Sequence, residues 1–306
     1  MLLAILKKMN NRIVIYLLIF ACVLTSCQDE IPEPRNNPKE AFHYKNPPLP
    51  QNVEELRILA IGNSFTDDAT AYMYTIVDKG GVDANRYCLY KIAHPSASLD
   101  HFVDLSNSKK FVTAELCAGH IAMEDKGTLG DIVAQDWDVI VIQQASDLSD
   151  KWESYKNMGK YIDFLCHTCT NDRVCLMLQL PWSHTKEEMP DVLNNNISCT
   201  LLASQCFGID IIIPTGTAIQ LARNTELNDD MYLTHDNWHL NQGIGRYIAN
   251  CVWYQKLFIT TLGGRDIVGN ESRPTIGEYN SHQLELAQKC AKQAVFSPWD
   301  YNAHVE

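Results

Sequence analysis

Segments rich in apolar residues alternate with amphipathic segments from about residue 56 onwards, and this block pattern is the clearest structural signal in the sequence. Five short apolar segments stand out: 56–61, 86–93, 137–144, 174–180 and 209–213. Short, nearly continuous apolar runs are typical of strands buried on both faces of a parallel sheet. Longer segments with helical spacing separate them: 69–79, 151–169, 188–206 and 242–257. We therefore predict a three-layer α/β/α sandwich with a parallel central sheet over residues 56–306.

The first 27 residues have the pattern of an export signal rather than of a folded segment. Basic side chains near the start precede an apolar run over residues 13–24, which is too short to span a bilayer stably. The run closes in Leu-Thr-Ser-Cys, and this ending resembles a bacterial lipobox, where the cysteine is lipidated and becomes the mature N-terminus. We predict a signal peptide over residues 1–26 and lipidation at Cys27.

Residues 27–55 are rich in proline, asparagine and charge, a composition that disfavours both helix and sheet. We predict a tether that lifts the domain off a membrane. The acidic residues directly after Cys27 resemble the surface-export signal of Bacteroidetes lipoproteins. The expected location is the outer membrane, reached as an exported lipoprotein, with the cell surface and the periplasmic face both left open.

The formal net charge of −12 argues against two classes of partner. Nucleic acid requires a basic surface, and so does electrostatic binding to an anionic membrane. A neutral substrate fits this charge better. The anchor to a membrane is expected to be the lipid on Cys27.

Nine of the eleven cysteines follow Cys27, and most have apolar neighbours, as expected for small buried side chains. Cys166 and Cys169, with Cys175 nearby, have the spacing of half a zinc site, but no second pair is in register with them. We therefore predict no metal centre. One or two disulfides are compatible with export, and the sequence leaves their pairing open.

Polar side chains follow the predicted strands, where the active sites of open parallel sheets form. Ser64 follows the first strand, Ser96 the second, and Gln143 with Gln144 the third. A further group of polar residues, 234–239, precedes the last of the predicted helices.

Asp236 and His239 are three residues apart, a spacing that brings a carboxylate and an imidazole together at a helix start or in a tight turn. The carboxylate can then fix the imidazole tautomer, and the imidazole can take the proton of a serine hydroxyl. Ser64 is the natural partner, since it lies on a strand-to-helix turn. The adjacent Trp238 is open to two interpretations: stacking on a sugar ring, or anchoring the helix start.

Gly62-Asn63-Ser64 and Asp236-Asn237-Trp238-His239 resemble the motifs of the SGNH (GDSL) hydrolase superfamily. With the segments 141–146 and 214–223, the chain is similar, more narrowly, to the DUF4886 group of Bacteroidetes proteins. The resemblance implies a flavodoxin-like fold and a serine esterase mechanism without metal or cofactor. Ser64 would be the nucleophile, His239 the base and Asp236 its orienting partner.

The resemblance also implies an oxyanion hole, which departs from the family pattern at two positions. One donor is the N–H of Ser64 itself. The family glycine falls on Ser96, which keeps a backbone N–H but lacks the freedom of glycine. The family asparagine is absent, and a glutamine would supply the amide donor, with Gln144 preferred over Gln143.

We expect a serine hydrolase that cleaves ester bonds. Its expected substrates are O-acyl esters of carbohydrate, with acetyl foremost. The acylated substrate would be a small molecule or a polysaccharide. The expected intermediate is an acyl-Ser64 enzyme. One alternative is a lipase or thioesterase on the same residues, which predicts a long apolar groove. Another is a non-catalytic glycan-binding lipoprotein that retains the fold.

Overall fold

The computed structural model describes residues 44–117, 124–184 and 191–305 of the chain. These residues belong to the second of two compact units, which spans residues 38–306. The predicted signal peptide, the predicted lipidation site Cys27 and the first part of the predicted tether lie outside the described residues.

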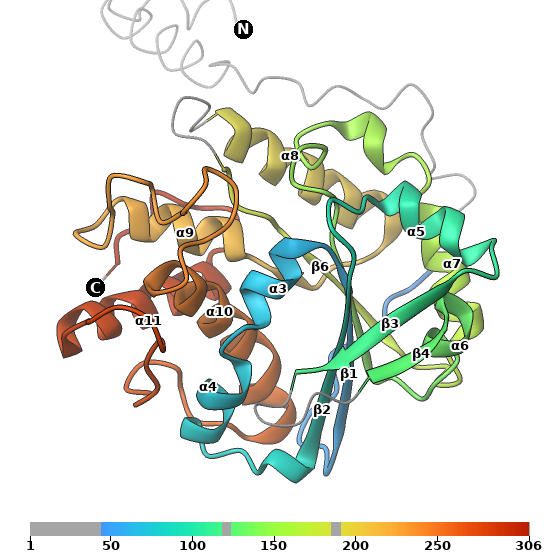
Figure 1. Cartoon of the computed structure of the whole chain (residues 1–306), viewed down its shortest axis with the longest axis horizontal. Helices are drawn as coiled ribbons and strands as arrows, with labels where there is room; N and C mark the ends of the chain where they lie inside the picture. The colour runs from blue at the N-terminus through green and yellow to red at the C-terminus, as the bar shows by residue number, and fades with distance from the viewer. Residues whose placement is uncertain (1–43, 118–123, 185–190, 306) are drawn as a thin grey trace, which may run out of the picture. The chain divides into compact units, whose positions relative to one another are not determined.

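A seven-stranded sheet in the order β4-β3-β2-β1-β5-β6-β7 forms the centre of this unit (Figure 1). Five neighbouring strands are parallel: β2 (Tyr87–Ala93), β1 (Leu56–Gly62), β5 (Val139–Ile142), β6 (Cys175–Gln179) and β7 (Ile212–Ile213). Numbered along the chain, these five have the order 2-1-3-4-5, which is that of flavodoxin-like folds. The predicted fold class is confirmed.

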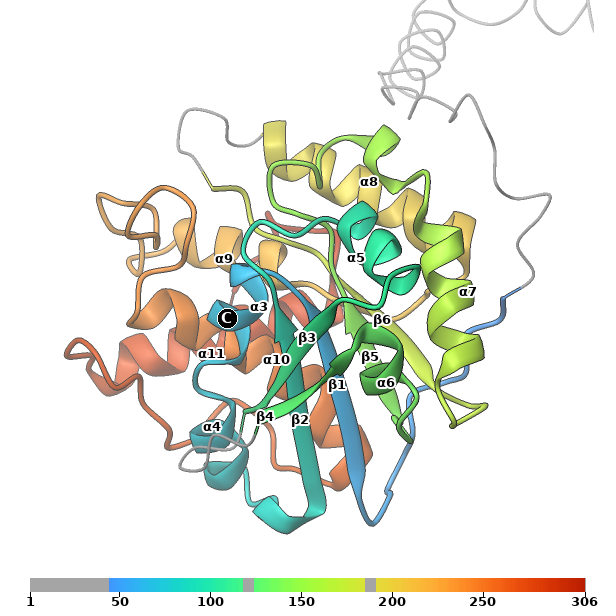
Figure 2. The same ribbon diagram turned by 45° about the vertical axis from the view of Figure 1, so that its right-hand side comes forward.

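Two further strands, β3 (Phe111–Leu116) and β4 (Glu124–Thr128), extend the sheet beyond β2 in antiparallel pairing (Figure 2). The block pattern does not predict them. β4 reads Glu-Asp-Lys-Gly-Thr, and Ala114 is the buried side chain of β3. Strands at a sheet edge are commonly charged, because one edge stays in solvent and pairing with other chains must be avoided.

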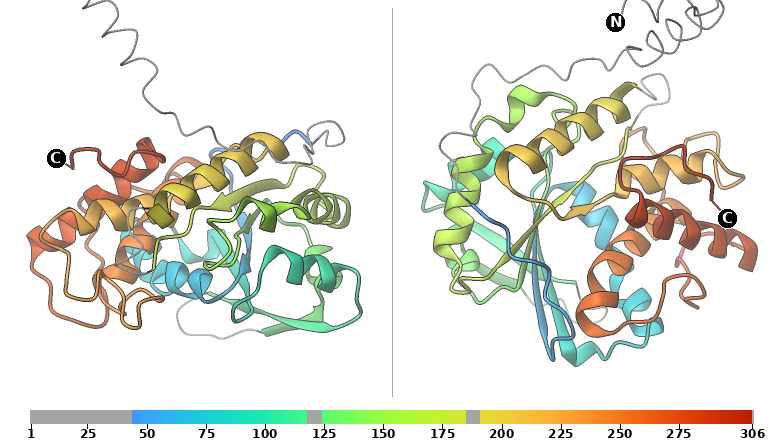
Figure 3. Two further views of the ribbon diagram at one scale, coloured as in Figure 1. Left: turned by 90° about the horizontal axis from the view of Figure 1, so that it is seen from above. Right: turned by 180° about the vertical axis from the view of Figure 1, so that it is seen from behind.

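Helices cover both faces of the sheet, as Figure 3 shows. One layer consists of α3 (Ser64–Thr70), α4 (Met73–Lys79), α9 (Thr215–Arg223), α10 (Ile244–Leu262) and α11 (Ser281–Phe296). The other consists of α5 (Leu99–Ser106), α6 (Leu129–Val133), α7 (Met158–Thr168) and α8 (Asp191–Phe207). The described residues also form two single turns of 3₁₀ helix, η2 (Ala84–Arg86) and η3 (Trp152–Tyr155).

The side chains of β1 divide between two hydrophobic cores, one on each face. Ile58 and Ala60 pack with the layer that contains α10, whereas Leu59 and Ile61 pack with the layer that contains α7. Successive side chains of a strand point to opposite faces, so a strand buried on both faces must be apolar throughout. This explains why β1 stands out so clearly in the sequence.

The helix predicted over residues 69–79 is two helices, α3 and α4, and the first begins earlier, at Ser64. The side chain of Asn250 separates them. It accepts a hydrogen bond of 2.8 Å from the Tyr72 N–H and donates one of 2.8 Å to the Asp68 carbonyl. These two backbone groups would otherwise bond each other within one continuous helix.

The domain begins before residue 56, which corrects the predicted extent of the tether. Asn46 is buried, and its side-chain amide bonds both the N–H and the carbonyl of Leu176 in β6, each at 2.8 Å. Because β7 has two residues, it leaves this part of the β6 edge unpaired, and Asn46 satisfies the exposed backbone groups. The tether interpretation therefore does not hold for the described residues 44–55.

All nine cysteines that follow Cys27 are free thiols, and six of them are buried. This agrees with their predicted role as small apolar side chains. Within the described residues, no helix combines the length and the apolar composition needed to cross a membrane.

Candidate active site

The candidate nucleophile, Ser64, lies where β1 ends and α3 begins. A side chain at Gly62 would come within 2.2 Å of the Thr66 hydroxyl, so this turn requires glycine. Asn63 caps α3, since its side-chain oxygen accepts a hydrogen bond of 2.9 Å from the Phe65 N–H. Ser64 is thus half-buried at the carboxyl edge of the sheet, beside the point where the strand order reverses.

The candidate base and its orienting carboxylate lie in a tight turn between α9 and α10, not at a helix start. A bridge between Thr234 and Leu240 closes the turn. Asn237 at its tip has a φ of +67°, a left-handed conformation that asparagine tolerates better than most residues. The turn brings the side chains of Asp236 and His239 together on one side.

The three candidate catalytic side chains form one continuous hydrogen-bonded chain. His239 Nδ1 lies 2.6 Å from Asp236 Oδ2, and His239 Nε2 lies 2.8 Å from Ser64 Oγ. A carboxylate accepts hydrogen bonds, so Nδ1 carries the proton and Nε2 presents its lone pair to the hydroxyl. This is the arrangement in which an imidazole can remove a serine proton.

Hydrogen bonds keep Asp236 ionised. Its partial burial raises its pKa, but the side-chain and backbone N–H groups of His239 and the Trp238 N–H all donate to the carboxylate and outweigh burial, bringing the pKa to about 2. The two backbone bonds, to Oδ1, measure 2.7 Å from His239 and 3.0 Å from Trp238. Asp236 is therefore a fixed negative charge beside the imidazole, and it stabilises the positive charge that His239 gains on taking a proton.

A buried carboxylate, Asp68, ties the nucleophile helix to the histidine turn. Its Oδ2 accepts a hydrogen bond of 2.8 Å from the Leu240 N–H, next to His239, and its Oδ1 lies 2.8 Å from Arg246 of α10. Burial raises the pKa of Asp68, whereas Arg246 and the Leu240 bond oppose that rise. Sequence reasoning missed this residue, although a pair of carboxylates at residues 67–68 in an otherwise buried helix was a usable signal.

Ser96 occupies the turn in which the family resemblance places a glycine. Ala97 N–H donates to the His94 carbonyl at 3.0 Å across this turn, with Pro95 and Ser96 as its central residues. Ser96 has a φ of +54°, a conformation that favours glycine at the third position of a type II turn. The chain thus keeps the turn with serine in it, and Ser96 is exposed.

Gln144, the preferred amide donor, has no N–H left to offer. Its Nε2 donates to the backbone carbonyl and the hydroxyl of Ser154, both at 2.9 Å, while its oxygen accepts from the N–H groups of Leu99 and Ala145. An amide nitrogen carries two hydrogens, and both are committed here. The preference for Gln144 is therefore wrong in this geometry, because the side chain joins β5, α5 and η3 instead.

The side-chain amide of Gln143 is only partly used in hydrogen bonds to the protein. Its Nε2 donates one hydrogen bond of 2.5 Å to the Asn63 side chain, and its oxygen accepts one of 3.0 Å from the Thr66 hydroxyl. Both partners belong to the turn that carries Ser64. The second hydrogen of Nε2 is not accounted for by these bonds, so Gln143 is the remaining side-chain candidate for an oxyanion donor.

A cavity of about 500 Å³ lies beside α3, between the carboxyl end of β2, α5 and β3. Asp67, one turn after Ser64, forms part of its wall, as does His94, two residues before Ser96. Its charged and imidazole-bearing lining residues are Asp67, Lys91, His94, His101, Lys110 and Glu115. Burial and the adjacent His94 lower the pKa of His101, which favours its neutral form.

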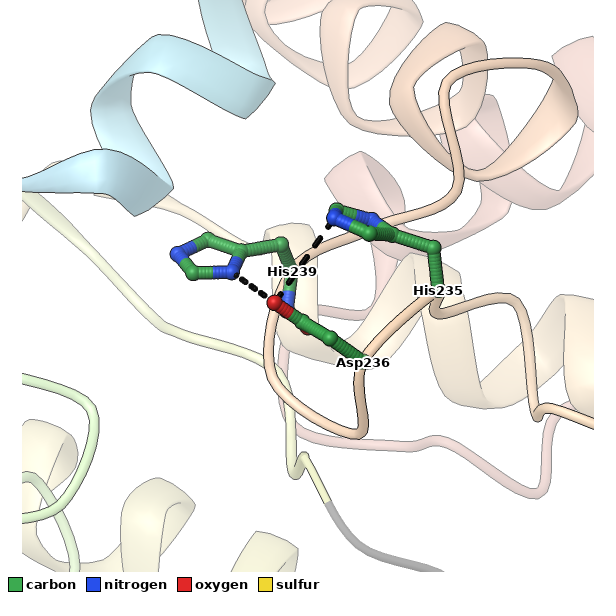
Figure 4. Close-up of side chains that lie close together, drawn as sticks. All are labelled: His235, Asp236 and His239. Atoms are coloured by element: carbon green, nitrogen blue, oxygen red, sulfur yellow. Dashed lines mark hydrogen bonds and ion pairs between the residues drawn. The ribbon is translucent and has the colours of Figure 1, made fainter.

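His235, Asp236 and His239 have side-chain atoms within 4.8 Å of one another, the spacing of a metal-ligand group (Figure 4). Both imidazoles face the same carboxylate oxygen, His235 Nε2 at 3.6 Å and His239 Nδ1 at 2.6 Å. The shorter distance is that of a hydrogen bond, and an ion would have to displace the shared proton. These residues fit the acid–base pair better than a metal site, and no other such group occurs in the described part of the chain.

Comparison with solved structures shows a likeness in fold to a member of one protein family. A DUF4886 family protein from Bacteroides uniformis ATCC 8492 superposes with a TM-score of 0.71 at 25% sequence identity, covering 80% of this chain and 96% of that one. A protein from Slackia heliotrinireducens with a provisional assignment as an SGNH hydrolase gives a TM-score of 0.41 at 14% identity, covering 66% and 98%. A catalytic mutant of an acetylxylan esterase from Geobacillus stearothermophilus gives 0.45 at 12% identity, covering 67% and 96%.

No curated protein sequence matches the chain. The family model described as a domain of unknown function, DUF4886, matches residues 57–294. This match contains β1, the serine turn, the histidine turn and nearly all of α11. The chain therefore belongs to the DUF4886 family.

Proposed function

We propose that the protein is a serine esterase that removes O-acyl groups, acetyl foremost, from carbohydrate. The observation that carries this proposal is the unbroken chain from Asp236 through His239 to Ser64, with contacts of 2.6 and 2.8 Å. The two ends come from segments 175 residues apart in sequence. A hydroxyl, an imidazole and a carboxylate joined in this order have one well-understood use, nucleophilic attack on an acyl carbon.

The reaction follows from these contacts. Ser64 Oγ attacks the ester carbonyl carbon while its proton passes to His239 Nε2. The tetrahedral intermediate collapses, the carbon–oxygen bond to the sugar breaks, and the departing oxygen takes the proton from Nε2. Water then attacks the acyl-Ser64 ester and loses a proton to Nε2. The bond between the acyl carbon and Ser64 Oγ breaks, Oγ takes the proton from Nε2, and the acid leaves. Each step uses side chains, backbone N–H groups and water.

The negative oxygen of the tetrahedral intermediate requires hydrogen-bond donors. The backbone N–H groups of Ser64 and Ser96 are the main-chain candidates, and the free hydrogen of the Gln143 amide is the side-chain candidate. Backbone donors come from fixed turns, so they need little reorganisation during the reaction.

The cavity beside α3 is polar, but Ser64, Asp236 and His239 are not among the residues that line it. Half of its twelve lining residues carry a charge or an imidazole, and its walls offer both donors and acceptors. The preference for a carbohydrate ester over a fatty acyl chain therefore rests on the sequence resemblance.

The proposed location is the outer membrane, with the lipid on Cys27 as the anchor. This part rests on the export pattern of the first 27 residues. Mass spectrometry of the N-terminal peptide tests it: diacylglycerol on Cys27 is expected, and an unmodified N-terminus upstream of Cys27 in the exported protein would contradict it.

Ester hydrolysis tests the proposed function directly. The purified protein is assayed on p-nitrophenyl acetate and on acetylated xylan, with Ser64→Ala as the matched variant. We expect turnover of both esters and a loss of about 10⁴-fold or more in Ser64→Ala. Equal rates for the two proteins would contradict the proposal and favour the non-catalytic glycan-binding alternative.

A further inference from the structure

An exposed tryptophan lies directly beside the candidate base. Trp238 precedes His239 in the histidine turn, and 39% of its surface is exposed, which is unusual for the largest apolar side chain. Its neighbour across the ring is the buried imidazole of His184, not the apolar core. Anchoring of the α10 start, one of the two interpretations of this residue, does not account for that position.

Both the backbone and the ring of Trp238 are held in place. Its N–H donates to Asp236 Oδ1 at 3.0 Å, and its carbonyl accepts a hydrogen bond of 2.9 Å from Trp182 Nε1. Its ring stacks on His184, with 3.8 Å between centroids and 11° between planes. A side chain fixed at backbone and ring loses little conformational freedom when a ligand binds to it.

The same contacts connect this tryptophan to the nucleophile. Trp182, which holds the Trp238 carbonyl, stacks on Phe65 with 3.8 Å between centroids and 7° between planes. Phe65 directly follows Ser64 and also contacts the His239 ring edge-on. Trp238 is therefore connected to Ser64 and His239 through one hydrogen bond, from Trp182, and two aromatic contacts of Phe65.

The chemistry of ester cleavage decides which part of a substrate meets this ring. His239 Nε2 gives its proton to the departing alcohol oxygen, so the alcohol portion of the ester must lie on the His239 side of the site. A pyranose ring has a face of C–H groups, and such a face stacks well on an indole, while the hydroxyl groups stay in water. An open-chain polyol has no comparable flat face.

We infer that Trp238, supported by His184, is the platform on which the sugar ring of the leaving group stacks, so that it selects pyranose esters over open-chain esters. This inference rests on the proposed esterase function and adds a specificity-determining residue to it. Trp238 acts on the choice of alcohol, whereas Ser64, His239 and Asp236 act on the acyl transfer.

Two acetyl esters of aliphatic alcohols test the inference, peracetylated xylose with a ring and glycerol triacetate without one. For each protein the measured quantity is selectivity, the ratio of kcat/KM for the ring ester to kcat/KM for the open-chain ester. We expect Trp238→Ala to lower this ratio about tenfold, mainly through KM of the ring ester, and Trp238→Phe to restore most of it. Phe296→Ala is the matched control, because Phe296 is 70% exposed at the end of α11, outside the proposed site, and should leave the ratio unchanged.

The outcomes separate the two proposals. Turnover that depends on Ser64 but shows the same ratio in wild type and Trp238→Ala would overturn the platform and leave the esterase standing. A parallel fall for both esters in Trp238→Ala and Trp238→Phe would assign the residue a structural role in the turn and likewise overturn the platform. Absence of Ser64-dependent turnover in the wild type would overturn the proposed function and the inference with it.

Discussion

The two halves of the candidate site are built in different ways. The half that would move protons is complete: Ser64, His239 and Asp236 are already in hydrogen-bonding contact, and two backbone N–H groups hold the carboxylate in place. In the half that would receive the negative oxygen, most side-chain amide groups already form structural hydrogen bonds. Gln144 makes four hydrogen bonds to three residues, and the Gln143 amide bonds Asn63 and Thr66.

This difference indicates which half of the site would limit the rate of ester hydrolysis. Proton transfer would depend on three side chains that already contact one another, and Asp236 also holds its turn through the N–H groups of His239 and Trp238. Stabilisation of the oxyanion depends mainly on backbone turns, whose shape is fixed by neighbouring residues such as Pro95 and Asn63. We therefore expect substitutions of the three hydrogen-bonded side chains to act mainly on rate. In the other half, we expect the effect to fall mainly on rate at Gln143 and on stability at Gln144.

Asp236→Asn should give the largest effect of the substitutions below, about 10³- to 10⁴-fold in kcat. The asparagine amide would donate to His239 Nδ1, which forces the proton onto Nε2 and removes the lone pair that faces Ser64. The neighbouring Asp230→Asn removes the same charge from an exposed position and serves as the control. Comparable kcat values for these two variants would show that Asp236 does not set the tautomer.

The pH dependence of the protein also tests the role of Asp236. The pKa of Asp236 is about 2, below its usual value, so its hydrogen bonds hold the turn at neutral pH and are lost only as the pH falls towards 2. A fall in kcat/KM between pH 7 and pH 4 must then come from a group other than Asp236. The difference in the free energy of unfolding between wild type and Asp236→Asn, followed against pH, tests this. A difference already lost between pH 7 and pH 5 would contradict the low pKa of Asp236.

Gln143→Met and Gln144→Met form a matched pair that separates the two glutamines. Loss of the Gln143 amide should lower kcat by about 10²-fold, the usual effect of removing one oxyanion donor. Loss of the Gln144 amide leaves the buried N–H groups of Leu99 and Ala145 without acceptors and should reduce the free energy of unfolding by about 2 kcal/mol, with kcat of the folded protein retained. Chemical denaturation and active-site titration give both numbers, and the opposite ranking in kcat would restore Gln144 as the donor.

Asp68→Asn should weaken the connection between the nucleophile helix and the histidine turn. The buried carboxylate loses its charge opposite Arg246, which we expect to reduce the free energy of unfolding by about 2 kcal/mol. Looser placement of Leu240 should lower kcat about tenfold while KM stays the same. Arg246→Gln supplies the control in a double-mutant cycle, and simple additivity of the two substitutions would mean that the pair is not coupled.

Ser96 should give the smallest effects. Serine at a φ of +54° is strained relative to glycine, so Ser96→Gly should raise the free energy of unfolding by up to about 1 kcal/mol. Ser96→Val should lower it by a similar amount and reduce kcat severalfold, because a β-branched residue disfavours this turn and moves its N–H. Thermal unfolding of the three proteins measures the trend, and a valine variant as stable as the glycine variant would contradict a left-handed turn.

The sequence predicts those features of the fold and the site that a single short segment of the chain determines. The apolar strands β1, β5 and β6 are continuous runs, and Ser64, Asp236 and His239 stand in short motifs with meaning at fixed spacing. These features are encoded locally, so they can be recognised without coordinates.

The features that escaped prediction all depend on contacts between distant segments. Asn250 interrupts the predicted helix from 178 residues away, Asn46 completes the edge of β6 from 130 residues away, and Asp68 reaches Leu240 across 172 residues. The role of Gln144 was misjudged for the same reason, since Ser154 and Leu99 are not visible as its partners in the sequence. A polar side chain in an apolar segment signals that a partner exists, but only the fold identifies it.

The central claim is that His239 and Asp236 activate Ser64 as a nucleophile. Labelling of the purified protein with a fluorophosphonate, followed by mass spectrometry of the modified peptide, tests it most directly. We predict a single phosphonyl adduct on Ser64, formed at least about 10²-fold more slowly in His239→Ala. An unlabelled Ser64, or labelling at the same rate without His239, would contradict the account.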